Sequence, residues 1–282
     1  MSADLHIHST ASDGTLTPAQ IVRQAHETGL TAISLTDHDT VDGVLPAIQA
    51  ALKTDLEVIP GIELNTDWGD VEIHILGYYL EIRSKQLQNV LNELRQGRED
   101  RARTMIKKLS AMGVFLSFDR LREIAGSGTI GRPHVAQAMM EAGYVSSIRE
   151  AFDNFLRFGK PAYVPRHKLD PFYAIDVVQN AGGIPVLAHP GLMKKDELIP
   201  EFVEKGILGI EVYYPQHTPD MLEKYRLMCE EYGLIKTGGT DYHGPGMEYP
   251  PLGTVTVTEE TVAHLKRVHR RIQQNHQKKQ ES

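Results

Sequence analysis

Two kinds of segment alternate along this chain: short apolar runs typical of strands, and longer amphipathic runs typical of helices. The first four predicted strands are residues 4–8, 31–35, 56–64 and 71–79, and the predicted helices between the first three are residues 18–29 and 41–52. Thr17 is in position to cap the first helix, and Pro18 fits its first turn. Because polar residues gather where the strands end, the pattern predicts an α/β fold, either a barrel or a doubly wound sheet, with a site at the carboxyl ends of its strands.

The alternation is interrupted in the middle of the chain. Residues 84–112 form a long, charged helical pattern, three shorter helices are predicted at 118–125, 132–143 and 146–158, and a strand signal returns at 162–164. We therefore expect a helical insertion at residues 99–165, which divides the α/β domain into residues 1–98 and residues 166–282. After the insertion, helices are predicted at 171–181, 219–232 and 259–277, and strands at 184–188, 208–213, 234–237 and 254–258.

Composition excludes several classes of protein. Lys and Arg number 30 against 37 Asp and Glu, a net charge of −7, so no broad surface for duplex DNA is expected, although a local basic pocket for phosphate stays open. The single cysteine, Cys229, cannot form an internal disulfide. The N-terminus lacks a secretory-signal pattern, and no run approaches the roughly 18 apolar residues of a membrane span. We expect a cytoplasmic protein with neither a membrane partner nor an obligate protein partner.

Acidic residues and several of the thirteen histidines lie at strand ends. In His6-Ile-His8 the two imidazoles share one face of a strand, as do the side chains of Asp241-Tyr-His243. Each motif alone also fits a polar strand end or a solvated loop. Together they form a nitrogen and oxygen ligand set without sulfur, which suits Mn²⁺, Fe²⁺ or Zn²⁺ rather than a cysteine-type structural zinc site. The candidate ligands, enough for two or three divalent ions, are His6, His8, Asp13, His38, Glu63, His74, His189, Asp241 and His243.

These motifs, in this order from the N-terminus to about residue 258, resemble the PHP family (polymerase and histidinol phosphatase), whose members are metal-dependent phosphoesterases on a distorted (β/α)₇ TIM-like barrel. The resemblance implies that Glu63 bridges two ions, and that Asp13, His38 and Asp241 also take part in catalysis. One ion would have the ligands His6, His8, Glu63 and Asp241; a second would have Glu63, His74 and His189; a third would have Asp13, His38 and His243. Mn²⁺ is the expected metal, with Fe²⁺ or Zn²⁺ as alternatives, and some relatives carry His in place of Asp13. Asp37 and Asp39 are expected to orient imidazoles.

The insertion contains Gly131-Arg132-Pro133-His134, in which an arginine precedes a predicted helix. A guanidinium and helix amides there suit a phosphate, although a structural salt bridge fits Arg132 equally well. Together with Lys160 and Tyr163, this segment resembles the branch of the family that acts on nucleoside 3′,5′-bisphosphates and short RNA 5′ ends. His134 and His217 are further candidates for substrate contact. The alternatives are a solvated surface for Lys160 and a plain helix-start turn for His217.

The resemblance implies a phosphoesterase that hydrolyses phosphate monoesters of nucleotides through attack by a metal-bridging hydroxide. Arg132 would act in catalysis and in substrate binding. The general acid stays open between His134, His217 and a water. Two alternatives remain: a histidinol-phosphate phosphatase, and a non-catalytic metal-binding module that docks to a polymerase.

Overall fold

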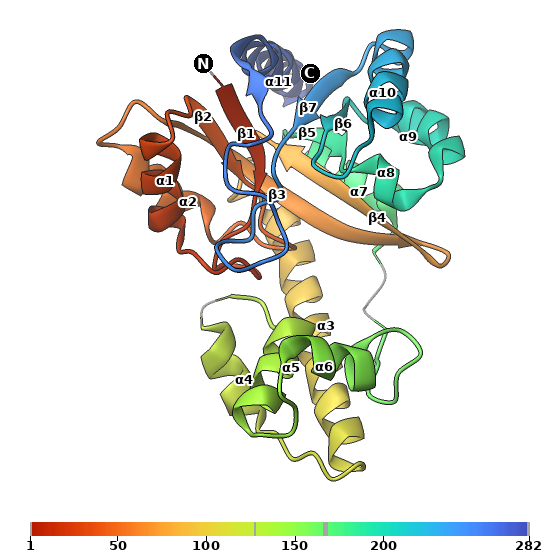
Figure 1. The fold of residues 1–282 in the computed structure, drawn as a ribbon. Helices are drawn as coiled ribbons and strands as arrows, with labels where there is room; N and C mark the ends of the chain where they lie inside the picture. The colour runs from red at the N-terminus through yellow and green to blue at the C-terminus, as the bar shows by residue number, and fades with distance from the viewer. Residues whose placement is uncertain (1, 127, 166–168, 281–282) are drawn as a thin grey trace. The chain divides into compact units, whose positions relative to one another are not determined.

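The computed structural model describes residues 2–126, 128–165 and 169–280 (Figure 1). The chain forms two compact units: one contains Met1–Val90 and Lys168–Ser282, and the other contains Leu91–His167. The expected boundary between residues 165 and 166 borders residues 166–168, which lie outside the described part of the chain.

The first unit is built on one eight-stranded sheet in the order β7-β6-β5-β4-β3-β2-β1-β8. β1, β2 and β3 run parallel, as do β5, β6 and β7, while β4 is antiparallel to both of its neighbours. The sheet nearly closes on itself, because Ile7 pairs with Tyr242 beyond the end of β7 and the His8 amide donates to the Tyr242 carbonyl at 2.9 Å. The prediction of a distorted TIM-like barrel is thus confirmed. The strands are β1 (Ser2–Ile7), β2 (Ala32–Leu35), β3 (Glu57–Trp68), β4 (Val71–Tyr78), β5 (Ile184–Leu187), β6 (Gly209–Tyr213), β7 (Ile235–Gly238) and β8 (Val257–Thr258).

Helices cover the outside of the barrel (Figure 1). Leu5 packs in an apolar cluster with Leu265, and Ile7 packs in another with Ile21. Because side chains alternate along a strand, the other face of β1 is left to Asp4 and His6. The helical elements of this unit are α1 (Pro18–Glu27), α2 (Val44–Ala51), α7 (Pro171–Asn180), α8 (Pro190–Met193), η2 (Asp196–Leu198), α9 (Ile199–Lys205), α10 (Pro219–Tyr232) and α11 (Glu259–Gln280).

Local chemistry explains where two of these helices begin. Thr17 caps α1 as predicted: its hydroxyl accepts the amide of Gln20. The Gln20 side chain in turn accepts the amide of Thr17, which completes a capping box. α2 begins at Val44 rather than at residue 41. Thr40 accepts the amide of Asp42 in a side-chain turn, which precedes the helix.

The second unit is helical and has its own apolar core. Its elements are the main part of α3 (Lys85–Ser110), α4 (Phe118–Ala125), α5 (Arg132–Glu141), α6 (Ile148–Ala151) and the π-helical turn η1 (Phe152–Leu156). The expected strand at residues 162–164 is absent there, and that prediction is wrong. Ala162 instead lies buried in the helical core, where its amide donates to the Phe155 carbonyl.

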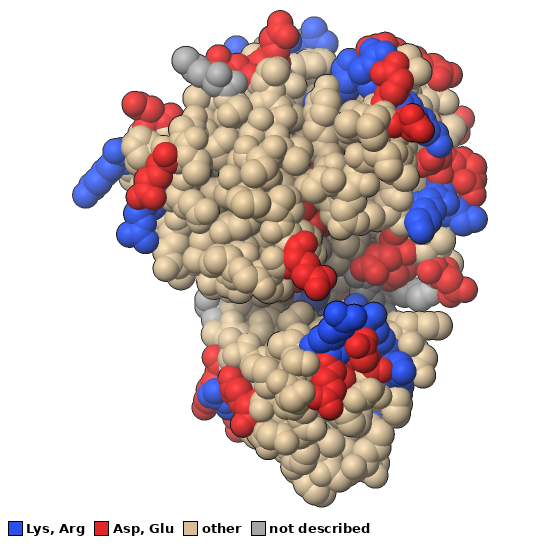
Figure 2. Space-filling model, in the orientation of Figure 1, with Lys and Arg blue, Asp and Glu red and all other residues tan. Residues whose placement is uncertain are grey.

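The surface agrees with the balanced composition. On the face drawn in Figure 2, Lys and Arg side chains are mixed with Asp and Glu, and the described side chains form no continuous basic surface there. Within the described ranges, no helix is both long enough and apolar enough to cross a bilayer.

Candidate metal centre

β1 delivers two histidines to the centre of the site. His6 is in β1 and His8 directly follows it, and both side chains are fully buried on the same face. Their Nε2 atoms lie 3.1 Å apart. Two imidazole nitrogens aimed at one point are an arrangement that a shared cation stabilises.

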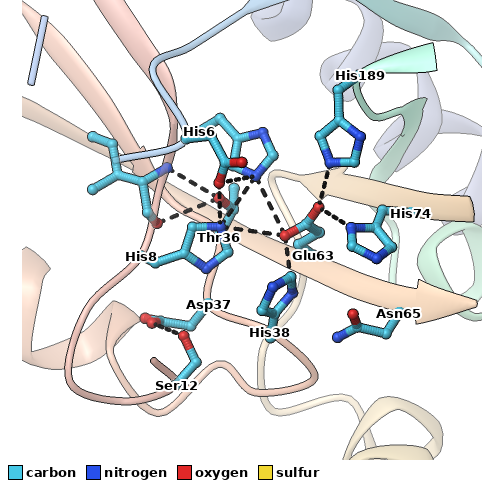
Figure 3. A network of polar contacts seen from close by, with 12 residues as sticks. His6, His8, Ser12, Thr36, Asp37, His38, Glu63, Asn65, His74 and His189 are labelled. Atoms are coloured by element: carbon cyan, nitrogen blue, oxygen red, sulfur yellow. Dashed lines mark hydrogen bonds and ion pairs between the residues drawn. The ribbon is translucent and has the colours of Figure 1, made fainter. Parts of the chain in front are cut away.

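Glu63 in β3 lies between two groups of histidines (Figure 3). Its side chain is only 1% exposed. Its Oε1 atom lies 2.7 Å from Nδ1 of His74 and 3.0 Å from Nε2 of His189. Its Oε2 atom faces the other group, at 2.9, 3.2 and 3.3 Å from nitrogens of His38, His8 and His6. A carboxylate with each oxygen turned to a different set of nitrogens can bridge two cations.

Asp241 and His243 follow β7 and complete the site. Asp241 Oδ1 lies 3.0 Å from Nε2 of His8, and its Oδ2 accepts a hydrogen bond from the Tyr214 hydroxyl at 3.0 Å. Its φ of 53° is in the left-handed region, which is rare outside glycine and is common at functional sites. His243 Nε2 lies 3.4 Å from Oδ1 of Asp13.

Three groups of side chains each bring their ligand atoms within 4.8 Å of one another. Their composition differs in detail from the sets that the resemblance implied: His8 also joins Asp13, and His38 also joins Glu63 and His74. His189 contacts the group of His38, Glu63 and His74 through Glu63 Oε1. The groups are His6, His8, Glu63 and Asp241; His38, Glu63 and His74; and His8, Asp13, His38 and His243.

The hydrogen bonding of these side chains fits cations. Five buried ligand atoms have no hydrogen-bond partner among the described residues, although such atoms are normally satisfied. They are His8 Nδ1, Asp13 Oδ1, His38 Nδ1, Glu63 Oε2 and Asp241 Oδ1. The short contacts around them therefore lack hydrogen-bond geometry. Nitrogen and oxygen donors of this kind suit Mn²⁺, Fe²⁺ or Zn²⁺.

In three of the imidazoles, the ring nitrogen that faces away from the site contacts an oxygen atom. Nδ1 of His6 contacts Glu211 at 2.9 Å, Nε2 of His74 contacts Glu72 at 3.0 Å, and Nδ1 of His243 contacts the main-chain oxygen of Asp241 at 2.8 Å. In each ring an oxygen acceptor holds one nitrogen, so the other nitrogen is left to face the site. Metal-binding histidines are typically oriented in this way.

The charges in the site perturb one another strongly. Burial lowers the pKa of His8, but Asp241 and Glu63 outweigh it and raise the pKa to about 10. Burial likewise lowers the pKa of His74, and Glu63 and Glu72 raise it to about 9. Burial raises the pKa of Glu63, yet the surrounding histidines hold it well below its usual range. Without metal, protons therefore balance the carboxylates.

Glu211 is a site residue that the sequence analysis missed. It lies in β6, is fully buried, and contacts both His6 and the main chain of His189. Glu63 stands out in the sequence because it ends an apolar run, and Glu211 gives a similar signal as an acid within the apolar strand predicted at residues 208–213. Asp4 was also missed: burial raises its pKa to about 6, and it accepts hydrogen bonds from Thr240 and from the Gly253 amide.

Two residues singled out in the sequence have partners other than those expected. Asp37 accepts hydrogen bonds from Ser9 and Ser12, so it orders the loop that carries Asp13 rather than an imidazole. Asp39 likewise accepts from the main-chain and side-chain nitrogens of Asn65.

His217 is buried close to the main chain. Its Nδ1 contacts the Val212 carbonyl at 2.8 Å, and its Nε2 accepts the Gly191 amide at 3.2 Å. Burial lowers its pKa. Both ring nitrogens thus have main-chain partners, an arrangement that orders the loop before α10.

The predicted substrate contacts Arg132, His134, Lys160 and Tyr163 all belong to the second unit. Arg132 begins α5, and its guanidinium carbon lies 5.8 Å from the centre of the Phe152 ring. His134 Nδ1 accepts the Gly131 amide at 2.9 Å and so caps the same helix. Lys160 is exposed, and Tyr163 packs edge-on against Phe158.

Comparison with known proteins decides the family. The family model described as the PHP domain matches residues 4–163. The chain belongs to the PHP family. The 3′,5′-nucleoside bisphosphate phosphatase of Chromobacterium violaceum is 34% identical over 86% of this chain and 87% of its own length. The 5′-3′ exoribonuclease Rnm of Escherichia coli is 32% identical over 86% of this chain and 85% of its own length.

A solved structure agrees with these relatives. A Bifidobacterium adolescentis protein described as a candidate metal-dependent phosphoesterase has a TM-score of 0.86 and 29% identity, over 93% of this chain and 94% of that one. This PHP protein is therefore a phosphoesterase, and the predicted resemblance to the nucleotide branch of the family is confirmed.

Proposed function

We propose that this PHP phosphoesterase removes phosphate from phosphate monoesters of nucleotides, with nucleoside 3′,5′-bisphosphates as the first substrate class and short 5′-phosphorylated RNA as the second. The observation that carries the proposal is Glu63, whose two oxygens face two groups of histidines. The substrate class is supported by the two relatives that span most of the chain.

Two or three divalent ions, Mn²⁺ first, would be held by the nine candidate ligands. Bound there, they would lower the pKa of a water and neutralise the charge of phosphate oxygens. The protein's own contribution is to hold these ligands in the strands of the barrel and in the loops that connect them. Asp13, His38 and His74 have side chains 27%, 17% and 14% exposed, whereas Glu63 is 1% exposed. The phosphate would therefore approach from the side of Asp13, His38 and His74.

Metal removal tests the catalytic part of the proposal. Chelation should abolish phosphate release from a nucleoside 3′,5′-bisphosphate, and added Mn²⁺ should restore it. Elemental analysis of the same sample measures the metal left after chelation. Full activity with no metal left would contradict the proposal. Turnover of histidinol phosphate without turnover of bisphosphates would instead favour the histidinol-phosphate alternative.

Arg132 tests the substrate part. At the first residue of α5, its guanidinium can hold a phosphate through two parallel hydrogen bonds. Arg132→Ala should lower kcat/KM for the bisphosphate roughly ten- to a hundred-fold and leave an aryl phosphate nearly unaffected. Arg149→Ala is the control, because that side chain is 82% exposed in the same unit. An equal loss on both substrates would place Arg132 at the reacting phosphate, and no loss on either would make its role structural.

A further inference from the structure

Glu211 is not one of the candidate ligands, but it contacts two residues that are. It lies in the middle of β6 between Ile210 and Val212, and its side chain is fully buried. Its Oε1 lies 2.9 Å from Nδ1 of His6, and its Oε2 accepts the main-chain amide of His189 at 2.8 Å. A buried carboxylate is costly unless its partners compensate for the lost water, so these two contacts account for its presence.

Both partners of Glu211 must donate a hydrogen bond to it. The main-chain amide of His189 can only donate. The Nε2 atom of His6 faces the site, 3.3 Å from Oε2 of Glu63 and 3.4 Å from Oδ1 of Asp241. When Nε2 binds a cation it carries no proton, so Nδ1 keeps the ring proton and donates it. The two donors therefore meet different oxygens of the Glu211 carboxylate.

The amide that Glu211 holds belongs to a strained residue. His189 has φ 22° and ψ 60°, in the left-handed region that non-glycine residues disfavour. Its ring nevertheless reaches Oε1 of Glu63, while His6 faces Oε2 of the same carboxylate. Glu211 thus contacts one histidine on each side of the Glu63 bridge.

We propose that Glu211 is a positioning residue of the metal centre: it keeps Nε2 of His6 available as a ligand and holds His189 in its strained conformation, so that both sides of the Glu63 bridge form together. This role rests on the proposed function only in requiring that the centre binds divalent ions.

Glu211→Gln is the direct test. An amide has one acceptor oxygen, so its NH₂ group must oppose either the His189 amide or Nδ1 of His6. In the second case the ring proton moves to Nε2 and blocks the ligand. We expect the Mn²⁺ dissociation constant to rise roughly 10- to 100-fold, and bound metal to fall while the group with Asp13 and His243 retains its ion. Isothermal titration gives the dissociation constant, and elemental analysis gives the number of ions.

The control is Glu57→Gln, the same substitution at the first residue of β3, where the carboxylate contacts Tyr79 and Lys266. Glu211→Asp keeps the charge and both acceptors on a shorter side chain, and should give an intermediate dissociation constant. If the Gln variant does not fold by circular dichroism, the Asp variant decides. A folded Glu211 variant that binds Mn²⁺ like the parent overturns the role. A parent chain that binds no divalent ion overturns the metal centre itself, which is a different result.

Discussion

Replacing Glu63 by Gln should destabilise the metal-free protein in a strongly pH-dependent way. The substitution keeps the shape of the side chain and removes the charge that five imidazoles share. Without that carboxylate, protonation of the buried histidines in the folded protein becomes less favourable. The folded state then loses the stabilisation that came from binding these protons.

His74 gives the magnitude. Its side chain is 14% exposed, and its pKa is about 9 in the folded protein against an ordinary value of 6.5 for histidine. A raised pKa contributes stability that is complete below about pH 6.5 and is lost as the pH rises through 9. At pH 7 this linkage amounts to about 2.5 kcal/mol, and at pH 10 it falls to nearly zero. Glu63 and Glu72 cause the raised pKa of His74 and therefore this stabilisation. Glu63 also helps to raise the pKa of His8 to about 10, so the stabilisation that Glu63 provides includes a part from His8 as well.

Urea unfolding of the chelated proteins at pH 7 and at pH 10 measures the effect. Glu63→Gln should lower the free energy of unfolding by about 2 kcal/mol or more at pH 7, with a much smaller loss at pH 10. Glu72→Gln is the matched control: it contacts the same imidazole, but its side chain is 55% exposed, so the loss should stay below about 1 kcal/mol. A loss for Glu63→Gln that is equal at both pH values would refute this electrostatic argument.

Two further predictions follow from the same geometry. His8 and His74 are protonated at pH 7.5 in the metal-free protein, so Mn²⁺ must displace protons when it binds. Its affinity should therefore rise up to about pH 9. A binding enthalpy that does not depend on the ionisation enthalpy of the buffer would contradict this proton release. In Gly61→Ala, the new methyl group would lie 2.7 Å from the Leu35 carbonyl. That should cost about 1–3 kcal/mol and disturb Glu63 two residues later, whereas an unchanged Tm and metal content would show that the strand adjusts freely.

The candidate ligands could be found from sequence because each is tied to a local pattern. His6 and His8 share a strand face by their spacing alone, and Glu63 ends an apolar run. The ends of neighbouring strands then meet at one edge of the sheet, so local patterns were enough to predict a common site. A local pattern does not predict which ligand atoms face one another. His8, for example, contributes to two groups because its two ring nitrogens point in different directions.

Other features depend on contacts that no short segment encodes. Glu211 meets His6 across 205 positions of sequence, and only the curvature of the barrel brings β6 opposite β1. His217 is turned to the main chain because Gly191 leaves room for its ring: a Cβ at Gly191 would lie 2.8 Å from it. The strand expected at residues 162–164 does not form because, among the described residues of the helical unit, no strand lies beside this segment to pair with it.

The two ends of the barrel sequence meet at the same place. Asp4 accepts the hydroxyl and the amide of Thr240 across 236 positions, and the ligands His6 and Asp241 lie beside that junction. During synthesis, the histidines of β1 meet Glu63 early, but Glu211 and Asp241 are made much later, and contacts of such long range form slowly. The helical unit, whose core comes from one continuous stretch, can fold in the meantime. A divalent ion that binds only the closed barrel would then stabilise the finished fold, and the free energy of that stabilisation would rise with the concentration of the ion.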